Sequence, residues 1–153
     1  MKRYTLYILY TQIALLLCLA SCEKEDDIDK IFTGKTWYMA NGMIQGKPIS
    51  GDYLKRFYES EHLFYISFST SKVSGTLGAN AMFDGKWQAD GKRQTITLEI
   101  PYTISTQDIF ERNVYGVLKK TVRYSGDENI MTLYEDDYNY IGFSAKRSDK
   151  SEY

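Results

Sequence analysis

The sequence predicts a mainly β protein, an antiparallel eight-stranded barrel with one or two short helices. Short stretches, such as residues 64–68 and 96–100, alternate apolar and polar side chains with the period of two that half-buried strands show. Turn residues such as Asp90-Gly91 recur about every 8 to 12 positions, and the chain shows no parallel β-α-β rhythm. Both patterns are typical of antiparallel barrels and sandwiches. We favour the barrel because a meander that closes on itself leaves no exposed strand edge.

The first 21 residues have the form of a bacterial signal peptide. Lys2-Arg3 supplies a positive head, residues 5–17 are mostly apolar, and small residues precede Cys22. A transmembrane helix needs about 20 apolar residues, whereas this run is shorter and meets the charged residues 23–27 at once. We therefore expect a cleaved signal rather than a membrane span, and an ordinary secretory signal is the alternative to lipid attachment.

The end of this segment, Leu19-Ala20-Ser21-Cys22, resembles the lipobox of bacterial lipoproteins. The resemblance implies that the Cys22 thiol is acylated, that the signal is cut just before it, and that Cys22 becomes the first residue. Two or more acyl chains hold a protein stably on a membrane. The implied location is that of an outer membrane lipoprotein, periplasmic or surface-exposed, with the membrane as its partner through lipidated Cys22.

Residues 22–33 are predicted to form an acidic tether. Residues 24–27 resemble the acidic segment that sends some Gram-negative lipoproteins to the cell surface, and the alternative is a solvated linker that keeps the domain off the bilayer. The barrel domain is expected over residues 34–147, and residues 148–153 are expected to form a C-terminal tail. Removal of the signal leaves 132 residues, which suffice for a single domain.

The composition of the mature chain excludes several functions. Its 17 basic and 20 acidic residues give no basic excess, so nucleic acid is not an expected partner. Cys18 leaves with the signal and Cys22 would carry the lipid, so the domain has no thiol for a disulfide or for nucleophilic catalysis. His62 is the only histidine, which excludes a histidine-rich zinc site.

Strands and turns are expected to fill most of the domain. The eight predicted strands lie near residues 36–43, 63–69, 72–77, 80–89, 94–100, 119–125, 130–135 and 138–146. Two stretches, residues 50–60 and 108–120, carry helical periodicity instead, and Asp108 with Glu111 fits a capping box at the start of the second. This helix should pack Phe110, Val114, Val117 and Leu118 against the barrel and leave Glu111, Arg112 and Lys119 in water.

Three segments of the domain carry a resemblance to a family. Residues 34–37 read Gly-Lys-Thr-Trp, residues 83–91 place Asp-Gly on both sides of Lys-Trp-Gln-Ala, and residues 124–134 contain a Gly-Asp-Glu-Asn turn. Together they resemble small bacterial lipoproteins of unknown function whose domain is lipocalin-like, with some likeness to META-type domains. These motifs consist of glycine, tryptophan and turn residues. The resemblance therefore implies a lipocalin-like barrel and brings no catalytic residues.

The sequence shows no motif of an enzyme. Residues 42–47 are similar to a phosphate loop, but one residue too few separates the glycines, and Pro48 stands where Ser or Thr should follow. Asp127-Glu128 and Asp136-Asp137 lie at expected hairpin turns and lack the ligand spacing of a calcium loop. We expect no catalytic residue, no metal and no cofactor, although two carboxylates that meet in the fold could form a hydrolase site.

These observations favour a lipid-anchored envelope module that binds or assembles without catalysis. The alternatives are a carrier whose barrel holds a small apolar ligand and a hydrolase that uses unassigned acids. Trp37, Trp87 and Phe110 are the candidate ligand or core aromatics, and both tryptophans are expected to be buried. The 11 tyrosines of the mature chain suit a sugar or peptide platform as well as sheet packing. Bulky inward side chains would favour a filled barrel over a carrier.

Overall fold

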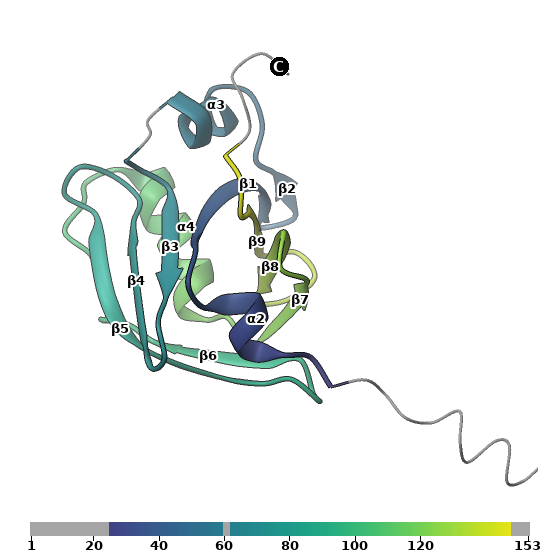
Figure 1. Ribbon diagram of the computed structural model, residues 1–153. Coiled ribbons are helices and arrows are strands. Elements are labelled where there is room, and N and C mark those ends of the chain that lie inside the picture. The colour runs from purple at the N-terminus through teal and green to yellow at the C-terminus, as the bar shows by residue number, and fades with distance from the viewer. Residues whose placement is uncertain (1–24, 60–61, 148–153) are drawn as a thin grey trace, which may run out of the picture.

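The computed structural model describes residues 25–59 and 62–147, which form one closed antiparallel barrel (Figure 1). The predicted signal peptide, Cys22 and the predicted tail over 148–153 lie outside the described residues. The hydrogen-bonded strand order is β2-β1-β3-β4-β5-β6-β7-β8-β9, and β1 also pairs with β9, which closes eight strands into the barrel. The predicted fold class is therefore confirmed, with one extra short strand. The strands are β1 (Thr36–Ile44), β2 (Lys47–Pro48), β3 (Tyr65–Phe68), β4 (Lys72–Thr76), β5 (Met82–Asp90), β6 (Thr95–Glu99), β7 (Arg123–Gly126), β8 (Ile130–Tyr134) and β9 (Tyr140–Ser144).

Three helices accompany the barrel in the described ranges, one more than the sequence predicts. They are α2 (Ile28–Phe32), α3 (Asp52–Glu59) and α4 (Ile109–Lys119). Helices α3 and α4 confirm the two predicted helices, with Asp108 capping α4 by accepting a hydrogen bond from the N–H of Glu111. None of the described helices is both long and apolar enough to cross a bilayer.

Helix α2 corrects the expected extent of the tether. The Asp27 side chain caps this helix by accepting a hydrogen bond from the Lys30 N–H at 3.1 Å. Ile31 and Phe32 are buried in the main core. The second half of the segment assigned to the tether, residues 22–33, is thus part of the folded domain, because its apolar residues fall on one helical face.

Large apolar side chains fill the barrel interior. Trp37 and Trp87 are 0% and 8% exposed, which confirms that both tryptophans are buried. The other bulky inward residues are buried as well: Phe64, Ile66, Phe68, Ile96, Leu98 and Phe143. Each side chain of this kind stabilises the fold by about 1.5–3 kcal/mol when it leaves water. The packing favours a filled core over an internal ligand cavity.

Helix α4 covers an opening of the barrel. It connects β6 to β7, two strands that share one paired position, Thr95 with Arg123. The helix contacts β1 and β9 as well as β6 and β8. Because β6 lies across the barrel from β1 in the strand order, the helix spans the opening rather than packing outside one wall. The sequence left this choice undecided.

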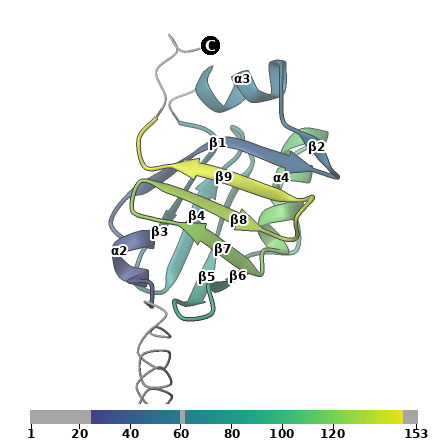
Figure 2. The same ribbon diagram turned by 90° about the vertical axis from the view of Figure 1, so that its right-hand side faces the viewer.

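The burial of α4 confirms one part of its prediction and corrects another. Its four predicted inward residues are buried, namely Phe110, Val114, Val117 and Leu118. Arg112 is exposed and Lys119 is half-buried. Glu111 was expected in water but is 8% exposed, because Arg56 of α3 pairs with its carboxylate. Helices α2 and α3 lie at opposite ends of the molecule (Figures 1 and 2).

Candidate functional site

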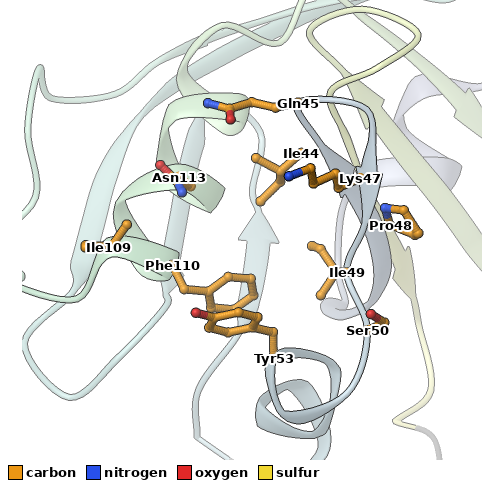
Figure 3. A pocket seen from close by; sticks show the side chains of 10 residues that line it. All are labelled: Ile44, Gln45, Lys47, Pro48, Ile49, Ser50, Tyr53, Ile109, Phe110 and Asn113. Carbon is orange, nitrogen blue, oxygen red and sulfur yellow. The ribbon is translucent and has the colours of Figure 1, made fainter.

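A surface cleft of about 310 Å³ lies between the chain that follows β1 and the helices α3 and α4 (Figure 3). Its size is at the lower end of the range for small-molecule sites. The apolar part of the lining consists of Ile44, Pro48, Ile49, Tyr53, Ile109 and Phe110. The rest of the lining is polar and contains no acidic residue.

Tyr53 and Phe110 form the aromatic floor of the cleft. Their rings stack with centroids 4.6 Å apart and planes inclined by 22°. Tyr53 belongs to the first turn of α3 and Phe110 to the first turn of α4, so the stack joins the two helices. Phe110 is buried, whereas Tyr53 is 56% exposed and its neighbour in the cleft, Ile109, is 67% exposed. Tyr53 therefore keeps more than half of its surface for contact with a ligand.

Arg56 of α3 links this helix to the first turn of α4 by two ion pairs. Its guanidinium donates to Asp108 Oδ2 at 3.0 Å and to Glu111 Oε1 at 2.9 Å. The same group lies over the rings of Phe64 and Phe110, 5.4 Å and 5.2 Å from their centroids. Cation–π contacts of this kind contribute about 0.5–2 kcal/mol each. Two ion pairs and the contact with Phe110 thus join α3 to α4, the two helices that carry Tyr53 and Phe110.

Glu111 is the buried partner in this frame. Its second carboxylate oxygen, Oε2, accepts a hydrogen bond of 2.6 Å from the Thr106 hydroxyl. The carboxylate lies against Gly78, where a Cβ atom would approach Oε1 to 2.3 Å. Only glycine leaves room for the carboxylate at this position. Both oxygens of Glu111 therefore accept hydrogen bonds, and the absence of a side chain at Gly78 leaves space for the carboxylate in this position.

A second cleft, of about 600 Å³, lies beside the N-terminus of α4 and includes Asp108 and Glu111. Two carboxylates at one cleft are what the hydrolase alternative requires. Here both are bonded to Arg56. Burial raises the pKa of Asp108, but the Glu111 N–H and the Arg56 charge outweigh it and leave this pKa below its ordinary value. A glycosidase acid needs a raised pKa, which Asp108 lacks, and the ion pairs with Arg56 make both carboxylates part of the frame that joins α3 to α4.

Four polar side chains surround the apolar floor of the first cleft: Gln45, Lys47, Ser50 and Asn113. Within the described ranges, their side chains make no hydrogen bond or ion pair with another residue. Lys47 is the only charged residue of the lining. The site therefore offers an aromatic surface together with amide, hydroxyl and ammonium groups that are available to a ligand.

The structure separates the three aromatic residues that the sequence grouped. Trp37 and Trp87 belong to the core, where their indole N–H groups donate to the Phe32 carbonyl at 3.3 Å and to the Ser69 carbonyl at 2.7 Å. Phe110 alone of the three lines the cleft. Sequence reasoning missed Tyr53 and Arg56 as site residues, although their three-residue spacing places them on one face of the predicted helix.

Several tyrosines of the mature chain pack within the fold. Tyr134 and Tyr140 lie 5.5 Å apart across β8 and β9, and Tyr115 is buried. Tyr102 and Tyr138 are exposed but do not line the first cleft. Sheet packing therefore holds for Tyr134 and Tyr140, whereas Tyr115 is buried on helix α4.

The acidic turns have the predicted turn chemistry. Asp127 Oδ1 accepts from the Asn129 N–H at 2.7 Å, and Asp136 Oδ1 accepts from the Tyr138 N–H at 2.7 Å. These bonds hold the pKa of both carboxyls below its ordinary value, with the Asn139 amide as the largest contributor at Asp136. In the part of the chain that the structure describes, no group of three or more metal-ligating residues comes together.

Fold and site together define a small antiparallel meander barrel that carries a half-apolar cleft at the end opposite to α2. The profile of the DUF4847 family, a domain of unknown function, matches residues 23–145. The chain therefore belongs to the DUF4847 family. The unknown function expected from the sequence agrees with this membership, while the family description mentions neither lipocalins nor lipid attachment.

A solved structure is similar to this fold. It is the crystal structure of a DUF4847 family protein from Bacteroides vulgatus, which superposes with a TM-score of 0.65 and is 22% identical in sequence. The similarity covers 80% of this chain and 99% of that chain. At this identity the likeness concerns the fold alone. No curated protein matches the chain.

Proposed function

We propose that this protein is a lipid-anchored module of the cell envelope that binds a carbohydrate in the cleft between β1 and helices α3 and α4, without catalysis. The observation that carries the proposal is the exposed Tyr53 ring, stacked on Phe110 and surrounded by polar side chains without internal partners. Anchoring rests on the lipobox ending at Cys22.

The chemistry of the lining favours a carbohydrate. A sugar ring has an apolar face of C–H groups, which suits contact with an amphipathic aromatic ring such as Tyr53. Its hydroxyls pair with amides and hydroxyls, which Gln45, Ser50 and Asn113 supply. Lys47 and the absence of acids from the lining also suit a sugar that carries a negative charge.

The frame beneath the cleft supports binding by a preformed site. Arg56 is held by two carboxylates and two rings, so the aromatic floor is ordered before a ligand arrives. A site that is already ordered avoids the entropic cost of arranging its side chains, about 0.5–1.5 kcal/mol for each one. The filled interior favours this external cleft over the carrier alternative, in which a ligand would enter the barrel.

The binding proposal is tested on a glycan microarray with the fluorescently labelled, detergent-solubilised mature protein. We expect the wild type to bind a defined set of oligosaccharides and Tyr53→Ala to bind the same set at least about tenfold more weakly, which corresponds to about 1.4 kcal/mol. Tyr102→Ala is the matched control, because Tyr102 is 86% exposed but does not line the cleft. Equal binding by wild type and Tyr53→Ala, or no bound glycan, would overturn the proposal.

The anchoring proposal is tested by membrane fractionation and mass spectrometry. The mature wild-type protein should start at an acylated Cys22 and partition with membranes. Cys22→Ala should lose both the lipid and cleavage at this site, because no other thiol is correctly placed. A wild-type protein that starts elsewhere contradicts the anchoring and leaves the carbohydrate test unaffected.

A further inference from the structure

The chain becomes fixed to the barrel at Asp26, very close to the proposed lipid. The Asp26 N–H donates to the Gly91 carbonyl at 3.2 Å. Its carboxylate accepts hydrogen bonds from the Tyr124 hydroxyl at 3.0 Å and from Gln94 Nε2 at 3.1 Å. A Cβ atom at Gly91 would lie 2.3 Å from the Asp26 carbonyl oxygen, so the close approach requires glycine. Three hydrogen bonds thus hold Asp26 in place, two to the turn between β5 and β6 and one to Tyr124 of β7.

Helix α2, which follows Asp26, is also fixed to the barrel, by the packing of Phe32 in the core. The fully buried Phe32 contacts three aromatic rings of the core, with centroid distances of 5.0 Å to Phe68, 5.1 Å to Trp87 and 5.0 Å to Tyr124. Aromatic pairs of this kind contribute about 0.5–1.5 kcal/mol each beyond their buried area. Helix α2 is therefore packed on the barrel and belongs to the folded domain rather than to a flexible linker.

The remaining linker is short. Three residues lie between Cys22 and Asp26, which makes four Cα–Cα steps, and a fully extended chain spans at most about 3.3–3.6 Å per residue. The α-carbons of Cys22 and Asp26 can thus be at most about 14 Å apart. An acylated Cys22 lies at the bilayer surface, since its chains enter the hydrocarbon. Asp26 and the turn beside it are then confined to that surface.

We propose that the barrel stands with its α2 end, formed by α2 and the β5–β6 turn, against the lipid headgroups, and that the cleft points away from the membrane. The inference rests on the proposed lipid anchoring at Cys22. Helix α3, which borders the cleft, lies at the end opposite to α2 in both views (Figures 1 and 2). The bilayer thus has a defined contact surface on this protein, and the cleft is open to ligands from the aqueous side.

Linker length rather than charge sets this orientation. The α2 end has exposed bases at Lys30, Lys92 and Arg93 but also exposed acids at Glu25, Asp27 and Asp29. Each basic residue near an anionic membrane contributes about 1 kcal/mol, and the acids oppose it. The β5–β6 turn should therefore stay at the membrane when its bases are neutralised.

The test uses the full lipidated protein in vesicles of phosphatidylethanolamine and phosphatidylglycerol that contain a headgroup-linked quencher. A fluorophore is placed at Lys92→Cys on the β5–β6 turn or at Lys55→Cys on α3, each in a separate protein. Both sites are exposed, and the mature domain has no other free thiol once Cys22 is acylated. We expect quenching at position 92 to be at least about fivefold stronger than at position 55, because quenching of this type acts only over short distances.

Two further variants separate linker length from charge. A 12-residue Gly-Ser insertion between Glu25 and Asp26 adds a flexible chain with a root-mean-square span of about 20 Å, and it should bring quenching at position 92 down to that at position 55. Arg93→Ala, combined with Lys92→Cys, should keep the strong quenching. Circular dichroism verifies that each variant is folded.

The outcomes distinguish the orientation from the anchoring. Equal quenching at positions 92 and 55 in a protein whose Cys22 is acylated by mass spectrometry overturns the orientation alone. A protein without the lipid overturns the anchoring and the orientation together. Loss of quenching in Arg93→Ala would overturn linker length as the cause and assign the orientation to charge.

Discussion

Replacement of Arg56 by Met should strongly destabilise the protein. Methionine retains much of the packing over Phe64 and Phe110 but removes the charge that neutralises Glu111. Removing one partner of a buried ion pair costs about 3–5 kcal/mol. The Glu111 side chain is 11% exposed, whereas Arg56 is 27% exposed and admits some water, which favours the lower end, about 3 kcal/mol. For a domain of this size such a loss lowers Tm by about 10 °C.

A double-mutant cycle measured by urea denaturation isolates the Arg56–Glu111 pair. Glu111→Gln in the Arg56→Met background should recover about 1–2 kcal/mol, because a neutral amide no longer leaves a buried charge and can still bond Thr106. Lys55→Met is the control: its partner Asp52 is exposed, and loss of that surface pair should cost less than about 0.5 kcal/mol. If Arg56→Met is no less stable than Lys55→Met, the frame assigned to Arg56 is wrong.

Two other predictions concern the core. Trp87→Ala should cost about 3–5 kcal/mol of unfolding free energy, because it removes the contacts with Phe32 and Phe68; an unchanged urea midpoint would contradict the core assignment. Burial raises the pKa of Tyr115 from 10.0 to about 12. The protonated side chain therefore contributes fully to the free energy of unfolding below about pH 10, and this contribution is lost as the pH rises through the pKa of the folded state. Tyr115→Phe should be less stable at pH 7 by about 1 kcal/mol, because it lacks the hydrogen bond to Pro101, and this difference from the wild type should shrink above pH 10.

The strands could be predicted because their signal is local. Alternation over residues 64–68 and 96–100 marks one buried and one exposed face, and a side-chain period of two belongs to any strand. All eight predicted strands have counterparts in the barrel. The short β2 was missed because two residues, Lys47–Pro48, carry no periodicity.

Misjudged positions are those where a distant partner overrides the local pattern. Glu111 occupies a helix position that the local pattern predicts to be solvent-exposed, and the charge that compensates its burial comes from Arg56, 55 residues earlier in the chain. Similarly, the run of acids before Gly34 reads as a solvated tether, yet Asp26 bonds Tyr124, 98 residues away. No window of sequence contains both members of either pair.

The sequence by itself determined the antiparallel barrel and the burial of both tryptophans, and it predicts a signal peptide that ends in a lipobox at Cys22. These depend on composition, periodicity and large apolar surfaces, which act in the same way in every fold. Only the tertiary structure decided that Tyr53 and Phe110 meet in a cleft, that Arg56 joins helices α3 and α4, and that Asp26 bonds the barrel. Such contacts depend on the relative placement of elements far apart in the chain, which the closure of the barrel sets.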